Sequence, residues 1–117
     1  MIIKKNLGGL HFYVNNDDAN SLLFLLDKLF NENERIFCVL ESGNDKSYST
    51  LEIGLSDDDY DYIEIERSLI SLYLSYDSIA LAINKLKRFL SDGFFITPEW
   101  CECENNKKMI SIYFMNK

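Results

Sequence analysis

Residues 49–67, with the sequence STLEIGLSDDDYDYIEIER, decide most of what can be expected of this fold. Leucines and isoleucines alternate with polar residues on both sides of a run of three aspartates. Alternation with a period of two residues is typical of strands that bury one face and expose the other. The stretch therefore predicts two neighbouring strands, joined by a loop at 56–59, that form an antiparallel hairpin.

The register of this predicted hairpin sets two acids against each other. If Ile53 lies opposite Ile63 in the core, Glu52 lies opposite Glu64 on the outer face. Like charges that face each other across strands destabilise a sheet by a few tenths to about 1 kcal/mol. A cationic partner that covered this face would relieve the repulsion.

The rest of the chain supplies further strands and two helices. Asparagine and aspartate at 15–18 can cap a helix that ends near 31–33, and Asp77 or Ser78 can cap a second one that Gly93 terminates. Residues 42–46 carry Gly43 and Asn44, which favour a turn. Further strands are expected at 10–14, 35–41, 94–104 and 109–115, and 69–74 fits either a strand or the start of the second helix.

These elements follow the order β-α-β-β-β-(β)-α-β-β. The expected fold class is α+β, a mainly antiparallel sheet of about six strands with two helices packed on it. Pro98 is the only proline, and no stretch rich in glycine and serine divides the chain. Because no period of 20 to 50 residues repeats either, residues 1–117 are expected to form one domain.

The charge of the chain is concentrated in one segment. The protein has 19 acids and 12 lysines and arginines, a formal charge of −7. Residues 41–66 contain nine of the acids and one base, whereas the remainder contains ten acids and eleven bases. The whole negative excess therefore belongs to the predicted hairpin and its flanks.

The excess of acids over bases argues against nucleic acid and anionic membranes as partners. Binding to a nucleic-acid backbone depends on clustered cations that neutralise phosphates, and binding to an anionic membrane depends on the same kind of cluster. The longest nearly uncharged stretch, 68–76, is far shorter than the roughly 20 residues that a membrane-spanning helix needs. The first residues lack the pattern of a signal peptide, so a cytoplasmic location is expected.

No catalytic, metal or cofactor motif stands out. The chain has three cysteines, which cannot all pair with one another, so they are expected to be reduced thiols. They are Cys38, Cys101 and Cys103, and Cys38 and Cys103 are expected to be mostly buried. Cys-x-Cys in a strand is a weak zinc signal, and His11 is the only histidine that could join it. Residues 57–68 lack the glycine and the final glutamate of a calcium loop. We therefore expect no metal, no cofactor and no enzymatic activity.

Acids mixed with tyrosines make a credible protein-binding surface, because tyrosine supplies rigid contact area and a hydroxyl at a low entropic cost. The segment that carries the charge excess also carries such tyrosines. The expected partner-binding residues are Glu52, Asp57, Asp58, Asp59, Tyr60, Asp61, Tyr62, Glu64 and Glu66.

Taken together, these features resemble the immunity proteins of bacterial toxin systems, including those of contact-dependent growth inhibition. The resemblance rests on a small acidic α+β chain, concentrated acids mixed with tyrosine and the lack of a catalytic motif. It implies a protein that binds a cognate toxin domain, often a basic nuclease, and covers its active site. Immunity proteins share no single fold, so the resemblance transfers no residue roles.

Two other classes of protein remain open, a mimic of nucleic acid and a small enzyme, although the usual sets of acid, base and nucleophile are missing for the latter. A phage or plasmid protein that inhibits a host enzyme by imitating nucleic acid would use the same carboxylates, with evenly spaced charge and two-fold symmetry. Alternatively, the acids form a solvated loop that only aids solubility, which is what runs of charge usually mean.

Overall fold

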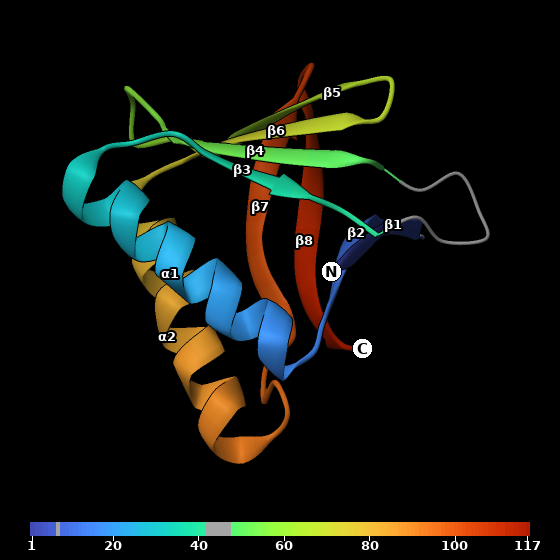
Figure 1. The fold of residues 1–117 in the computed structure, drawn as a ribbon. Helices are drawn as coiled ribbons and strands as arrows, with labels where there is room; N and C mark the ends of the chain where they lie inside the picture. The colour runs from blue at the N-terminus through green and yellow to red at the C-terminus, as the bar shows by residue number, and fades with distance from the viewer. Residues whose placement is uncertain (7, 42–47) are drawn as a thin grey trace.

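The computed structural model describes residues 1–6, 8–41 and 48–117. Within these residues, two helices pack against the same side of a curled sheet of eight strands (Figure 1). The turn expected at 42–46 lies outside the described residues. In chain order the elements are β1 (Ile2–Asn6), β2 (Gly9–Val14), α1 (Asn16–Glu32), β3 (Ile36–Val39), β4 (Thr50–Leu55), β5 (Tyr62–Glu66), β6 (Leu69–Leu74), α2 (Tyr76–Asp92), β7 (Glu99–Asn105) and β8 (Lys108–Asn116).

The sheet is mixed, with the strand order β1-β2-β8-β7-β5-β6-β4-β3. Consecutive strands pair antiparallel as β1–β2, β3–β4, β5–β6 and β7–β8, whereas β2–β8, β4–β6 and β5–β7 are parallel. The expectation of about six mainly antiparallel strands is therefore wrong. Alternation shows which residues share a face, but it does not show which strand lies next to which, and parallel neighbours are far apart in the sequence.

The predicted hairpin between the strands at 49–55 and 60–67 is also wrong. Strand β6 lies between β4 and β5 and pairs with both of them, in parallel with β4 and antiparallel to β5. Ile53 and Ile63 therefore both lie beside Leu72 of β6 and not beside each other. The segment that fitted either a strand or a helix start is thus a central strand of the sheet.

The chain is built from two copies of one pattern, strand-strand-helix-strand-strand. The first helix begins at Asn16 and the second at Tyr76, a spacing of 60 residues, and the strand that precedes each helix begins at Gly9 or Leu69, with the same spacing. The two halves exchange their last strands, since β8 pairs with β2 of the first half and β4 pairs with β6 of the second. One sheet therefore runs through both halves.

Burial follows the same duplication. Positions 60 residues apart are buried together in β1 and β5, in β2 and β6, and along the core-facing sides of the helices. Alternating strand residues and helix residues spaced by three or four supply this shared core. The matched pairs are Ile3 and Ile63, Leu10 and Ile70, Phe12 and Leu72, Val14 and Leu74, Ala19 and Ile79, Leu22 and Ala82, Leu26 and Leu86, and Leu29 and Phe89.

Both helices begin and end at residues suited to those positions. Asn15 caps α1 in a capping box with Asp18, and Ser75 caps α2 by accepting from the backbone N–H of Ser78. The cap expected at Asp77 or Ser78 is therefore wrong, because these residues lie inside the first turn of α2. Asn33 and Gly93 end the helices in the left-handed region, where asparagine and glycine are favoured. These local signals explain why both helices could be predicted from the sequence.

A similar backbone contact closes each half of the sheet on itself. The backbone N–H of Glu104 donates to the carbonyl of Asp61 at 3.0 Å, and the backbone N–H of Glu41 donates to the carbonyl of Met1 at 3.0 Å. Met1 and Asp61 occupy the same place in the two copies, immediately before β1 and β5. The second contact brings the edge strands β1 and β3 together, so the sheet curls nearly onto itself.

A test of the β2–β8 pairing is the substitution Gly9→Ala. A Cβ atom at Gly9 would lie 2.2 Å from the carbonyl oxygen of Ser111 on β8, so the strands must move apart. We expect this substitution to lower the free energy of unfolding by about 1 to 3 kcal/mol, as overpacking does. The measurement is urea denaturation followed by far-UV circular dichroism. Gly54→Ala is the control, because its Cβ atom meets only ordinary contacts at 3.6 Å, and equal stability of the two variants would contradict the pairing.

Candidate protein-binding surface

The acids of β4 and β5 lie on the face of the sheet that points away from the helices. Glu52 pairs with Ser71 of β6, and Ser71 pairs with Glu64 of β5, so the three residues form one row across the sheet. Their sequence neighbours Ile53 and Ile63 are buried on the opposite face. The two glutamates are therefore separated by two strand spacings, about 10 Å. The expected direct apposition of Glu52 and Glu64 is wrong.

Glu52 is also neutralised within the chain. Its Oε1 lies 2.8 Å from Nη1 of Arg35, and its Oε2 accepts a 3.5 Å hydrogen bond from the hydroxyl of Ser71. The carboxylate is 12% exposed, whereas Arg35 is 57% exposed. Of the expected partner-binding residues, Glu52 is thus one that presents little free charge to solvent.

The loop between β4 and β5 carries the most exposed acids. All four of its residues at 57–60 are exposed, namely Asp57, Asp58, Asp59 and Tyr60, and Tyr60 is 71% exposed. The backbone N–H of Asp58 donates to the hydroxyl of Ser56 at 3.2 Å, which shapes the turn without using a carboxylate. The three carboxylates of this loop are therefore displayed at the surface.

Asp61 differs from its neighbours because its side chain holds α2. One carboxylate oxygen accepts from the backbone N–H of Ser75 at 2.8 Å, and the other accepts from the hydroxyl of Ser78. Ser75 is the N-cap of α2, so the negative charge also lies at the favourable end of the helix dipole. Asp61 is half-buried, and its first role is to join the start of β5 to the start of α2.

Tyr62 forms the aromatic part of the surface. Its ring stacks on the ring of Tyr73 from β6, with the centroids 4.7 Å apart and an angle of 20° between the planes. Burial raises the pKa of the Tyr62 phenol, and nearby groups raise it further, first Tyr73 and then Asp57, Glu64 and Asp58. The hydroxyl therefore stays protonated, as a hydrogen-bond donor among carboxylates.

A hollow opens beside Tyr62 where β5 and β7 diverge. Among the described residues, these strands share one register pair, Tyr62 with Glu104. Beyond it lies a hollow of about 540 Å³, lined on its acidic side by Glu64, Glu66 and Glu104. Glu104 was not among the residues expected from the sequence. It follows Cys103, which was expected to be buried on a predicted strand, so the next side chain could have been placed on the outer face.

We use the name acidic face for half-buried Tyr62 and the exposed residues that these elements bring together around it. It includes the displayed loop, the outer side of β5 and one glutamate of β7. Its members are Asp57, Asp58, Asp59, Tyr60, Tyr62, Glu64, Glu66 and Glu104.

The thiols and the histidine are not brought together as a metal site. Cys101 and Cys103 are neighbours on β7, with their sulfur atoms 3.9 Å apart, whereas His11 packs against the ring of Tyr113 at a centroid distance of 4.9 Å. In residues 1–6, 8–41 and 48–117 there is no cluster of three histidine, cysteine or acidic side chains able to hold a metal ion.

The three cysteines are free thiols of low expected reactivity. Cys103 is buried, as the sequence predicts, whereas Cys38, which was expected to be mostly buried too, is half-buried, as is Cys101. A hydrogen bond with Cys103 and burial raise the pKa of Cys101, and burial raises the pKa of Cys38. Because the thiolate is the reactive form, these shifts slow attack on disulfide reagents.

This yields a second prediction. At pH 8 the native protein should react with a chromogenic disulfide reagent at least about tenfold more slowly than the same protein unfolded in urea. The release of the chromophore over time measures both rates. A Cys38→Ser variant reports on the β7 pair alone, and fast native reaction of that variant would show that β7 does not shield its thiols.

Comparison with protein-family models, with curated proteins and with solved structures finds no match to this chain. None of the helices in the described residues is long and apolar enough to cross a membrane. The interpretation of the acidic face therefore depends on its geometry and charge.

Proposed function

We propose that this protein binds a cationic protein domain through its acidic face and thereby neutralises a toxin. The observation that carries the proposal is the set of exposed carboxylates gathered around the stacked pair of Tyr62 and Tyr73. In the described part of the chain, the carboxylates that form ion pairs belong to Asp18, Glu41 and Glu52. None of these residues belongs to the acidic face, so its charges are available to a partner.

Charge and aromatic area would have different tasks in the complex. An acidic surface that meets a basic one can raise the association rate to about 10⁸ M⁻¹s⁻¹ or more at low salt. Exposed Tyr60 and the edge of Tyr62 offer contacts that salt screens less, because apolar area and neutral hydrogen bonds do not depend on ionic strength in the same way. Binding should therefore weaken with salt but not vanish.

Among proteins that bind cationic domains, we favour an immunity protein of a toxin system. The chain is small and strongly acidic, and its described residues bring together no metal cluster, which suits a binder more than an enzyme. A basic toxin domain, such as a nuclease, exposes a cationic groove for phosphates, and the carboxylates of the acidic face would occupy that groove.

The duplication argues against a two-fold imitation of nucleic acid. Glu64, Ile65 and Glu66 of β5 correspond to Lys4, Lys5 and Asn6 of β1 at the spacing of 60 residues. The charge therefore changes sign between the copies while the fold repeats. A mimic with two-fold symmetry needs the acids in both copies, whereas a single docking face for one partner needs them in one.

The experiment that tests the proposal is a search of the neighbouring genes for a toxin-like domain, followed by co-expression of that domain with this protein. We expect this protein to restore growth of cells that the domain arrests, and to form a stable complex with it in size-exclusion chromatography. A neighbouring domain that stays toxic and does not bind would overturn the proposal.

A further inference from the structure

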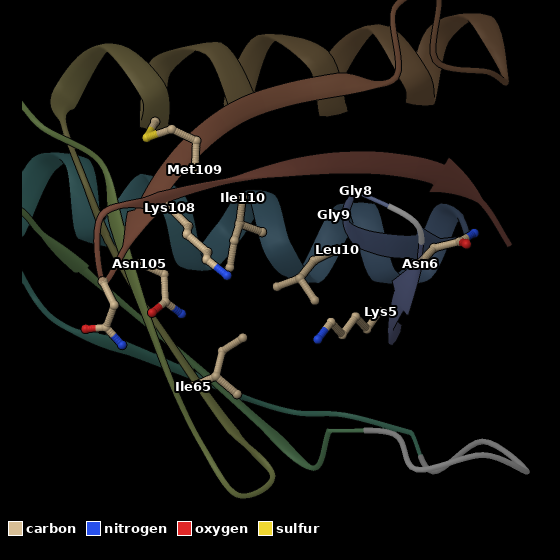
Figure 2. A pocket seen from close by; sticks show the side chains of 11 residues that line it. Lys5, Asn6, Gly8, Gly9, Leu10, Ile65, Asn105, Lys108, Met109 and Ile110 are labelled. Carbon is tan, nitrogen blue, oxygen red and sulfur yellow. The ribbon is translucent and has the colours of Figure 1, made fainter.

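The concave side of the sheet is not filled along its whole length. At the end that includes the β1–β2 and β7–β8 turns lies a pocket of about 480 Å³ (Figure 2). Leu10, Ile65 and Ile110 form its apolar part, and they come from three different strands. A volume of this size lies within the range of sites that bind small organic molecules.

Two lysines stand on the side of their strands that otherwise faces the core. On β1, Lys5 shares a side with the buried Ile3, and on β8, Lys108 shares a side with Ile110 and the buried Ile112. Figure 2 shows the side chains of Lys5 and Lys108 pointing into the space between the strands, toward Ile65 and Leu10. The pocket thus combines an apolar wall with two cationic groups.

The fold itself does not require a lysine at position 5. The corresponding residue of the second copy is Ile65, which lies across the same pocket. None of the described lining residues is acidic, and no ion pair in the described residues includes Lys5 or Lys108. Within the part of the chain that the structure describes, their charges are therefore not neutralised by an ion pair.

We propose that this pocket binds an amphiphilic anion, with a carboxylate, sulfonate or phosphate head group and a hydrocarbon body. The ammonium groups of Lys5 and Lys108 bind the head group, and the apolar wall covers the hydrocarbon. An ammonium group is a compact charge with three donors on a flexible stem, which suits anionic head groups of different shapes. Half-buried Ile65 and Ile110 lose solvent contact when the body enters.

This pocket adjoins the hollow beside the acidic face, because Ile65, Asn105 and Asn106 line both, but none of its described lining residues is a member of the acidic face. Because successive side chains of a strand point to opposite sides, Ile65 faces the pocket while Glu64 and Glu66 face the other side of the sheet. The proposal therefore does not depend on toxin binding and can be tested on the protein alone.

The test is calorimetric titration of the whole chain with octanoate, hexanoate and 1-octanol at low ionic strength. We expect one octanoate per chain, about fourfold tighter binding for each added methylene group, and much weaker binding of the neutral alcohol. Binding of octanol as tight as that of octanoate, or no saturable binding of octanoate, overturns the proposal.

Variants locate the site. Lys5→Ile, which copies the residue of the second half, and Lys108→Ala should each weaken octanoate binding about fivefold, and the double variant should weaken it more. Lys4→Ile and Lys107→Ala are matched controls, since Lys4 lies over the ring of Tyr13 on the other side of the sheet and Lys107 is absent from the pocket. Equal losses in the control variants show that net charge and not the pocket determines binding, which also overturns the proposal. Circular dichroism confirms that each variant is folded.

Discussion

Replacing Asp58, Glu64 and Glu66 together by lysine should abolish binding to the cationic partner while leaving the protein folded. All three side chains are exposed and belong to the acidic face. Removal of one member of a desolvated charge pair typically costs 2 to 5 kcal/mol, and reversal adds repulsion, so the affinity should fall about a hundredfold or more. Exposed substitutions usually change stability by no more than about 0.5 kcal/mol each. Calorimetric titration against the neighbouring toxin-like domain, at two salt concentrations, measures the loss.

The matched control changes net charge by the same amount elsewhere. Asp27, Glu32 and Glu34 are exposed acids in and just after α1, and their replacement by lysine alters long-range attraction without touching the acidic face. We expect this variant to bind more slowly but with a far smaller loss of affinity. Equal losses in the two variants would mean that only net charge matters and that the acidic face is not the interface.

The second large effect concerns stability and not binding. Asp61→Ala should lower the free energy of unfolding by about 2 to 4 kcal/mol, because the backbone N–H of Ser75 and the hydroxyl of Ser78 lose a charged acceptor at the start of α2. The indole N–H of Trp100 donates to the carbonyl of Ser78 at 2.8 Å, so the first turn of α2 is held from two sides. Removing Asp61 leaves one of these two attachments.

Urea denaturation measures this loss, and Asp59→Ala is its control. Asp59 belongs to the same acidic run but is exposed, so its removal should change stability by less than about 0.5 kcal/mol. Similar stability of the two variants would show that the contacts of Asp61 contribute nothing to holding α2. A strong effect of Asp61→Ala on folding also means that this residue cannot serve in a binding test.

Local signals in the sequence were sufficient for the helices but not for the sheet. The cap at Asn15 and the left-handed ends at Asn33 and Gly93 act within a few residues, so they can be recognised without the fold. The cap of α2 was expected at Asp77 or Ser78 and lies at Ser75, so the helix was found but its first residue was not. Strand β1 was missed because its only buried residue, Ile3, is followed by three polar residues, so the sequence shows no alternation there. Its pairing with β2 is what makes it a strand.

The duplication was missed for a related reason. The copies agree in which positions are buried, but Leu22 and Ala82, or Phe12 and Leu72, differ in size and shape. A core needs apolar side chains that fill its volume together, so a large residue in one copy can be balanced by a small one in the other. The two copies therefore share the positions of their buried residues but not the residue types at those positions.

The residues of the candidate sites likewise include some that the sequence could predict and some that it could not. The acids of the β4–β5 loop were accessible to prediction because a run of charge within one segment is visible in the sequence. Glu104 and the pocket lysines were not, because they depend on β7 diverging from β5 and on the sheet curling until Lys5 and Lys108 face one space. Such neighbours are defined only by the fold.

The exchange of final strands between the two copies has a consequence for how the chain acquires its structure. During synthesis β2 emerges early, but its parallel neighbour β8 comprises Lys108–Asn116, near the last residue described. Contacts between segments so distant along the chain require a large loop to close first, and this slows folding. The first copy therefore cannot complete its part of the sheet before β8 has been made, and the two copies should reach the native state in a single cooperative step.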